Sequence, residues 1–383
     1  MRSWVLILAL WCAGLGAAAQ FGKISVAFQD LGAAYQGQGA VAIGLMVSVV
    51  GLVGLVFGTT AGLIVARVGA RRAMLAALVL GALVSAAQSL LPPFPLMMLA
   101  RLAEGVSHLA IVVVGPVAIA QAAPPARQGA AMTLWSSFFG LTYAVLAWVG
   151  PGILQAHGIA GLFHWHALWM LGCALVLWRL MPRDVAVGAP RAEGIWAGHL
   201  AIYRSPFVAA PATGFVCYTV TYVAILTLMP AAMGPQGALA AVAMPLVSIG
   251  LSLTFGVWLL GRITAVHQVQ AGFALAAGAS LFLWPLWGTA AALAPALVVA
   301  GALGLVQGAS FASIPQLNPA AQDRARAAGA IAQLGNLGTT TGTPILAWLM
   351  QKAGVSGLAL FLFGFSVLGI ALHALQARRR LKA

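Results

Sequence analysis

Three ionisable residues stand close together in the stretch 101-RLAEGVSHLAIVVVGP-116. In a helix that turns by about 100° per residue, Arg101, Glu104 and His108 project from one face about 60° wide. A carboxyl on such a face can exchange a proton, an imidazole can pass that proton on, and a guanidinium can hold the carboxylate or a substrate anion. The spacing also allows Arg101 and Glu104 to form an internal ion pair at i and i+3. Both interpretations can hold together.

The composition shows what kind of environment surrounds this stretch. Of the 383 residues, 62% are hydrophobic and 6% are charged, and the mean hydropathy is +1.01. Soluble domains carry about 25% charged residues, so this chain cannot cover a water-exposed surface. Apolar runs of about 20 residues recur, each long enough to cross the hydrocarbon layer as a helix. Strand-like alternation is missing, which predicts an all-α integral membrane protein.

The apolar runs predict twelve transmembrane helices in two six-helix halves. The halves are residues 1–181 and 207–383, and the polar interval 182–206 forms a cytoplasmic loop between them. The expected spans are 4–28, 39–61, 73–91, 95–120, 130–153, 162–181, 207–231, 240–261, 269–288, 293–314, 327–350 and 357–376. The opening residues imitate a secretory signal. We interpret them as the first span, because basic residues near both ends of the chain then lie on one side.

The charge distribution gives the orientation. The net charge is +14 and the pI is about 11.3, a balance that also occurs in nucleic-acid-binding proteins. With the N-terminus in the cytoplasm, only Lys352 falls in an outside loop, and only Lys23 and Arg101 fall well inside spans, since Arg179 is at the cytoplasmic end of the sixth span. The remaining sixteen of the 19 basic residues are cytoplasmic, as the positive-inside rule requires. We therefore expect the protein to lie in the lipid bilayer of the inner membrane with both termini in the cytoplasm. We do not expect it to bind nucleic acid.

The two halves resemble each other at an offset near 200 residues. Glu104-Gly-Val-Ser-His108 is echoed by Gln307-Gly-Ala-Ser-Phe311. The fifth span ends in Gly150-Pro151, and the eleventh span is similarly rich in glycine and contains Pro344. Two six-helix halves that hold a substrate between them are a recognised plan for transporters.

A loop motif and two span motifs add a family resemblance. The stretch 58-GTTAGLIVARVGARR-72 resembles the loop signature of the major facilitator superfamily, Gly-x-x-x-Asp-Arg-x-Gly-Arg-Arg. Ala66 replaces the aspartate of that signature, and Ala70 is a second departure. The resemblance implies a cytoplasmic gating loop, and three arginines that only set the topology are the alternative. The matching residues are Gly62, Arg67, Gly69, Arg71 and Arg72.

The span motifs extend the resemblance over the chain. Arg101-Leu-Ala-Glu104-Gly105 is similar to an arginine and small-residue run that the family often has in its fourth span. Gly140, Gly150, Pro151 and Gly152 resemble a signature of exchangers in the fifth span, but its second glycine pair is lacking. The resemblance implies the fold of this superfamily and transport by alternating access.

Lys23 is the third charged residue within a span, besides Arg101 and Glu104. A charge at the middle of a membrane costs at least about 2.5–3.5 kcal/mol, so each of the three is a candidate for function. Lys23 either extends its ammonium to the outer surface or lines a cavity. The three charges sum to +1, which favours a solute with negative or strongly electronegative groups.

Neutral polar residues in the spans are further candidates for solute binding. Their hydroxyl and amide groups suit organic solutes, although hydrogen bonding between helices explains each of them equally well. His164 and His166 flank Trp165 near the outer edge of the sixth span, and we assign them to an interfacial aromatic belt. The candidates are Tyr143, Tyr218, Tyr222, Gln307, Gln333 and Asn336.

Two methionines suggest a different cargo. Met229 and Met233 share a helix face, and thioethers suit Cu(I). They resemble a Met-x-x-x-Met pair in a copper-importing branch of the superfamily, but residues 240–261 lack the His-x-x-x-Met pair of that branch. Packing is the alternative. Cys12, Cys173 and Cys217 are far apart in sequence and predict no disulfide or zinc site.

The sequence thus predicts a monomeric secondary transporter without a cofactor. A small organic solute would move through a cavity between the halves, coupled to protons through Glu104 and His108. The sequence slightly favours uptake as the direction of transport, because the exchanger signature is incomplete. Copper import is the alternative, and a membrane sensor or enzyme that transports nothing is a remote one. No nucleotide loop supports an enzyme.

Overall fold

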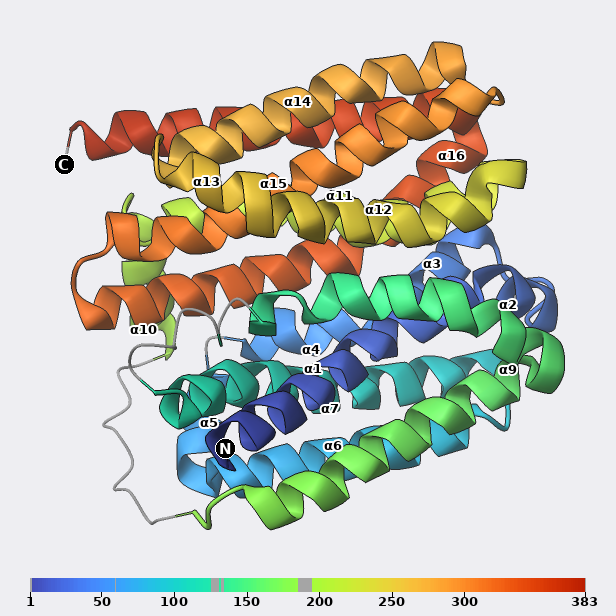
Figure 1. Ribbon diagram of the computed structural model, residues 1–383, viewed down its shortest axis with the longest axis horizontal. Coiled ribbons are helices and arrows are strands. Elements are labelled where there is room, and N and C mark those ends of the chain that lie inside the picture. Colours follow the sequence, from blue (N-terminus) through green and yellow to red (C-terminus); the bar gives the residue numbers. More distant parts are fainter. Residues whose placement is uncertain (1, 59, 125–130, 132–133, 185–194, 383) are drawn as a thin grey trace. The chain divides into compact units, whose positions relative to one another are not determined.

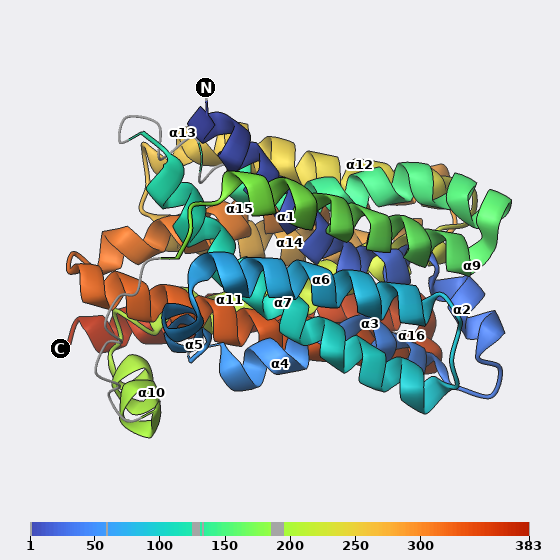
Figure 2. The ribbon, with the colours of Figure 1, turned by 90° about the horizontal axis from the view of Figure 1, so that it is seen from below.

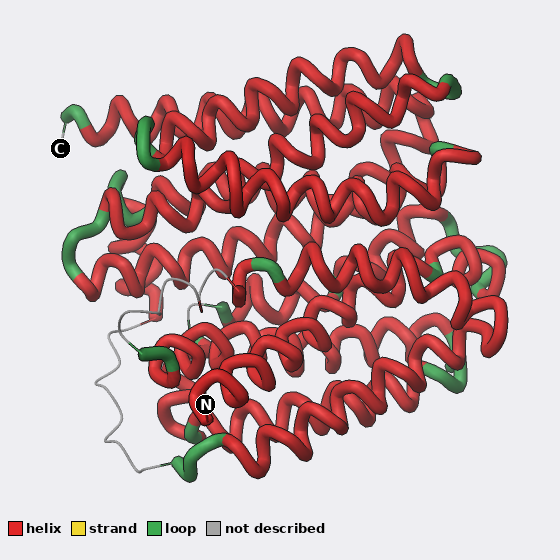
Figure 3. Tube along the Cα trace, in the orientation of Figure 1, coloured by secondary structure: helices red, strands yellow, loops and turns green. Residues whose placement is uncertain are grey.

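The computed structural model describes residues 2–58, 60–124, 131, 134–184 and 195–382. Throughout this part of the chain the regular elements are helices, joined by short turns (Figure 3). Helices satisfy their backbone hydrogen bonds within the segment, which is what a bilayer core demands. The helices divide into two compact units, residues 1–38 with 49–192 and residues 39–48 with 193–383.

The first unit is built around α1 (Arg2–Val26), which packs against α7 (Phe94–Ala122) and α9 (Phe138–Leu180). The helix α6 (Ala70–Gln88) lies beside α7 and the second half of α9 (Figures 1 and 2). Shorter helices complete the unit: α2 (Phe28–Ala34), α4 (Val50–Phe57) and α5 (Ala61–Val68). Its apolar core includes Ile7, Leu10, Met74, Leu78, Ile111, Met170 and Leu177.

The second unit contains the helix α11 (Ala210–Ala232), which packs along α16 (Ala321–Arg380). Small residues permit this approach, since a Cβ on Gly342 would lie 2.0 Å from the carbonyl oxygen of Val220. The other elements are α3 (Ala40–Ser48), α10 (Ile195–Arg204), η2 (Gly234–Gln236), α12 (Gly237–Leu251), the π-helical turn η3 (Ser252–Gly256), α13 (Val257–Leu260), α14 (Ala265–Leu286), η4 (Ala290–Ala292) and α15 (Leu293–Leu317).

Two of the long elements are helical hairpins. Gly158 in α9 and Gly354 in α16 interrupt the helical geometry with φ values of 65° and 55°, which favour glycine. Figure 1 shows that α9 and α16 each fold back along themselves. Together with the breaks at the two glycines, this divides each element into two spans.

The count of spans follows from these breaks. Nine helices in the described residues are long and apolar enough to cross a membrane, and α3 with α4 forms a tenth span bent by 52°. With the two hairpins divided, the described residues contain twelve spans, which confirms the predicted fold class.

The second span, expected over 39–61, consists of two helices with a break between them. It breaks between Ser48 and Val50, where the amide of Leu52 bonds the carbonyl of Val49 at 3.0 Å in a tighter turn. The two pieces also pack differently. The helix α3 contacts α16, where Gly44 approaches the backbone of Pro344, and α4 contacts α7. The expected start of the fifth span at residue 130 lies outside the described residues.

Candidate functional site

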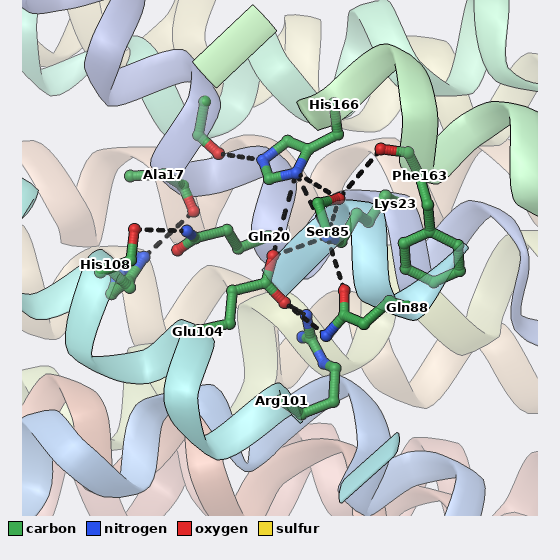
Figure 4. Close-up of polar contacts among 12 residues, drawn as sticks. Ala17, Gln20, Lys23, Ser85, Gln88, Arg101, Glu104, His108, Phe163 and His166 are labelled. Carbon is green, nitrogen blue, oxygen red and sulfur yellow. Dashed lines mark hydrogen bonds and ion pairs between the residues drawn. The ribbon is translucent and has the colours of Figure 1, made fainter. Parts of the chain in front are cut away.

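A cluster of charged and polar side chains lies inside the first unit (Figure 4). Four elements supply it, and every member is buried, with at most 6% of its surface exposed. Lys23 comes from α1, Ser85 and Gln88 from α6, Arg101 and Glu104 from α7, and His166 from the second half of α9.

The carboxylate of Glu104 is at the centre of this cluster. Its Oε1 lies 2.6 Å from Nζ of Lys23, and its Oε2 accepts a hydrogen bond of 3.0 Å from Nε2 of Gln88. The guanidinium of Arg101 also donates to Oε2, from one helical turn away on α7. Both oxygens therefore face donors, two of which are cations, and this arrangement stabilises the ionised carboxylate.

The ammonium of Lys23 has more partners than protons. Besides Glu104, its Nζ lies 2.9 Å from Oγ of Ser85, 2.9 Å from Oε1 of Gln88 and 3.2 Å from Nδ1 of His166. The ring of Phe163 lies 4.8 Å from the charge. Because an ammonium has three protons, these four polar partners compete for them. With 1% exposure, Lys23 points into the unit and not to the outer surface.

His166 contacts the cluster with a defined ring orientation. Its Nε2 lies 3.0 Å from the carbonyl oxygen of Gly16, which can only accept, so Nε2 carries the proton. In the neutral ring Nδ1 is then an acceptor, 2.9 Å from Oγ of Ser85 and 3.9 Å from Glu104. Because the one hydroxyl proton of Ser85 is donated to the carbonyl of Phe163 at 3.0 Å, Nδ1 accepts from Nζ of Lys23 and not from Ser85.

His108 has a different environment from the one expected. Its Nδ1 donates to the carbonyl oxygen of Ala17 at 3.0 Å, and its ring meets Phe21 edge-on at 5.0 Å. In the part of the chain that the structure describes, the hydrogen-bond and ion-pair partners of Glu104 come from Lys23, Arg101, Gln88 and His166. The predicted pairing of Glu104 with His108 is thus replaced by a contact with His166.

Sequence reasoning assigned His166 to the aromatic belt, although a signal for burial was present. Phe163, His166 and Met170 share one helix face, and all three are buried, whereas His164 and Trp165 point outward. Gln20 was also missed. It donates to Oγ of Ser107 at 3.0 Å, and that hydroxyl donates to the carbonyl of Ala77 at 2.7 Å.

The residues of the gating-loop motif surround the start of α6. Gly62 and Arg67 lie in α5, and Arg67 is exposed. Gly69 separates the helices with a φ of 99°, a conformation that favours glycine.

Asp184 caps the N-terminal end of α6, although it lies outside that helix in the sequence. Its Oδ1 accepts from the backbone amide of Arg71 at 2.8 Å, and its Oδ2 accepts from that of Arg72 at 3.0 Å. The guanidinium of Arg71 donates to the carbonyl of Trp178 at 2.6 Å. The motif lacks its own carboxylate at Ala66, and Asp184 places one at the positive end of α6 instead.

The remaining candidates are uncharged side chains, and Tyr143 interacts electrostatically with Arg101. Tyr143 in α9 lies 3.1 Å from Oγ of Ser25 and stacks on Phe139 at 5.7 Å between ring centroids. In the second unit, Tyr218 and Tyr222 are buried and stack at 5.1 Å.

The amide candidates are also in the second unit. Gln307 is half-buried in α15, the side-chain oxygen of Gln333 accepts from the hydroxyl of Tyr203 at 2.8 Å, and Asn336 donates to the carbonyl of Ala332 at 2.7 Å. Among the described residues of this unit, the buried side chains include no Asp, Glu, Lys or Arg.

The methionine pair proposed for copper lies at the end of α11. Met229 is buried in α11, and Met233 follows as its C-cap with 9% exposure. Among the described residues, no three or more His, Cys, Asp or Glu side chains form a group that could hold a metal ion. Cys12, Cys173 and Cys217 are free thiols. Copper binding by the methionine pair stays a prediction.

Comparisons with known proteins agree with the fold. The family model described as Major Facilitator Superfamily matches residues 6–343. A crystal structure of a bacterial homolog to the human lysosomal transporter Spinster, in an inward-facing and unoccupied conformation, is similar with a TM-score of 0.71. The alignment has 16% identity and covers 100% of this chain and 98% of that one. No curated protein sequence matches the chain.

Proposed function

We propose that this chain, which belongs to the major facilitator superfamily, couples the movement of a small organic solute to protons. Membership in this family of transporters supports the assignment as a secondary transporter of a small solute. Proton coupling, the direction of transport and the residues involved are our proposal.

The observation that carries the proposal is the burial of Lys23, Arg101 and Glu104 in one unit of membrane-crossing helices. Burying an ion costs several kcal/mol even after the protein relaxes around it, and ion pairs at best offset that cost. Apolar side chains would hold these helices together as well. Charges kept at such a cost suggest that the cluster changes its protonation during transport.

Neutral groups are proposed to contact the solute. Hydroxyl and amide side chains offer hydrogen bonds without a further charge, and the stacked rings of Tyr218 and Tyr222 offer a flat apolar surface. The proposed contact residues are Tyr143, Tyr218, Tyr222, Gln307, Gln333 and Asn336.

The proposed orientation has both termini on the cytoplasmic side of an inner membrane, with a monomer as the transporting unit. The distribution of basic residues along the sequence supports this orientation. The proposed functional halves are residues 1–181 and 207–383, joined by 182–206. Uptake is the proposed direction, because the exchanger signature of the fifth span is incomplete.

The proposal is tested with purified protein in liposomes. A thermal-shift screen first identifies a solute, since a ligand that binds the folded state raises its stability. With that solute and an imposed pH gradient, we expect protons to move into the lumen together with the solute. Glu104→Gln should abolish this movement.

A surface carboxyl is the matched control. Asp323 pairs with Arg326 at 3.7 Å and is 42% exposed, so Asp323→Asn should keep the coupled movement. Solute movement by the wild-type protein without any proton movement would contradict the proposed coupling and leave uniport or exchange.

A further inference from the structure

We infer that Lys23, and not Glu104, is the group that releases and regains the proton, and that His166 is its proton acceptor. This inference rests on the proposed proton coupling and names the group that performs it.

The cluster has a net positive charge. Lys23 and Arg101 are two cations, and among the described residues Glu104 is the one carboxylate that faces them, so a positive charge is in excess. The other acidic residues that the structure describes lie elsewhere. Asp184 caps α6, Asp323 pairs with Arg326, and Asp30 is exposed.

Protonation of Glu104 and deprotonation of Lys23 change the net charge of the cluster in opposite directions. Protonation of Glu104 would raise the excess from +1 to +2 and would remove the acceptor that two cations share. Loss of a proton from Lys23 would lower the excess to zero. Arg101 cannot take this role, because a guanidinium keeps its proton in proteins. Because the cluster is buried away from water, the smaller net charge favours proton exchange at the lysine.

Lys23 and His166 are also close enough to exchange a proton. The bond from Nε2 of His166 to the carbonyl of Gly16 leaves Nδ1 with the lone pair, and Nδ1 lies 3.2 Å from Nζ of Lys23. In the step we infer, an N–H bond of Lys23 breaks and an N–H bond forms at Nδ1. This leaves a neutral amine and an imidazolium, and the imidazolium then releases the same proton to water.

The groups that face Lys23 agree with this assignment. The helix α6 contributes the neutral side chains Ser85 and Gln88, which can hydrogen bond to either form of the amine. From α7 come Arg101 and Glu104, whose mutual pair remains neutral after the lysine has lost its proton. The two histidines near the cluster are His166 from α9 and His108 from α7, and His108 bonds the backbone of Ala17.

The composition allows a direct test by NMR. The chain has three lysines, Lys23, Lys352 and Lys382, and two glutamates, Glu104 and Glu193. Protein labelled with 13C only at lysine Cε, or only at glutamate Cδ, therefore gives a few signals that single variants assign. Lys352 and Lys382 are exposed and serve as internal controls.

We expect the Lys23 signal to shift between about pH 6 and pH 9, where ordinary lysines stay charged. The Glu104 signal should stay at its ionised position over the same range. A moving Glu104 signal with a constant Lys23 signal would overturn the inference and leave proton coupling intact. Two constant signals in a protein that moves protons in liposomes would overturn it as well. Absence of solute-driven proton movement would instead contradict the proposed function.

Variants in liposomes give an independent readout. Lys23→Arg keeps the positive charge, but a guanidinium does not release its proton. Solute binding should therefore persist while proton movement falls at least tenfold. His166→Gln should shift the pH profile of transport. The matched control is His164→Gln, because His164 is exposed and bonds Ser89. An unchanged pH profile in His166→Gln would show that this ring does not receive the proton.

Discussion

Nζ of Lys23 in α1 lies 2.6 Å from Oε1 of Glu104 in α7, with both side chains almost completely buried. The two residues are 81 positions apart in the sequence. Their pairing joins the first helix of the unit to the helix that also supplies Arg101. The contact therefore contributes to folding as well as to the proposed chemistry, and variants have to separate the two.

A double-mutant cycle on this pair measures its contribution to stability. Glu104→Gln leaves two buried cations without a counter-charge and should lower the free energy of unfolding by about 3–5 kcal/mol. In Lys23→Met with Glu104→Gln, the second substitution should cost much less, because one of the two cations is gone. Unfolding in mixed micelles gives the four values. Strictly additive losses would contradict a direct interaction.

The capping of α6 by Asp184 predicts a graded series. Asp184→Ala removes the acceptors for the amides of Arg71 and Arg72 and should destabilise the protein by about 0.5–2 kcal/mol. Asp184→Asn keeps one acceptor oxygen and should cost less. The thermal midpoint measures both, with the exposed Asp323→Ala as control. Equal midpoints for Asp184→Ala and wild type would show that the cap is dispensable.

The helices of this fold could be predicted from sequence because span length and hydropathy are local properties. The expected spans place the two reversals within 154–161 and 351–356. The residues that break the helices, Gly158 and Gly354, could not be identified in this way, since few of the 45 glycines adopt a positive φ. The break after Ser48 was also missed. It accompanies the packing of Gly44 on Pro344, a contact between residues 300 positions apart that no local pattern reveals.

The charged members of the site could be named from sequence, because a charge within an apolar span stands out. Which of them meet could not be derived, since this depends on which helices are neighbours. Hence His108, on the same helix as Glu104, was expected as its partner, whereas His166 reaches the cluster from α9. Asp184 likewise acts on a helix that begins 114 residues earlier.

Close packing of α11 on α16 predicts that Gly342 tolerates no side chain. A Cβ there would lie 2.0 Å from the carbonyl oxygen of Val220, so Gly342→Ala requires the two helices to separate. We expect a loss of about 1–3 kcal/mol, measured as a lower thermal midpoint. Gly364→Ala is the control on the same element, because no atom lies within 4 Å of its added Cβ. Similar midpoints for the two variants would contradict the packing argument.

The excess positive charge of the cluster predicts the charge of the solute. A bound anion would neutralise this charge as completely as the loss of a proton from Lys23 does, so an anion should bind best while the lysine is protonated.

Thermal-shift measurements with matched pairs of carboxylic acids and their amides separate the effect of the solute's charge from that of its shape. At a concentration 100 times its dissociation constant, a ligand adds about 2.7 kcal/mol to the stability of the folded state. We expect the acids to stabilise the protein more than their amides, and more strongly at pH 6 than at pH 9. In Lys23→Met the preference for the acid should fall at least tenfold in affinity. If the amides bind as tightly as the acids, the charge of the cluster does not select the solute.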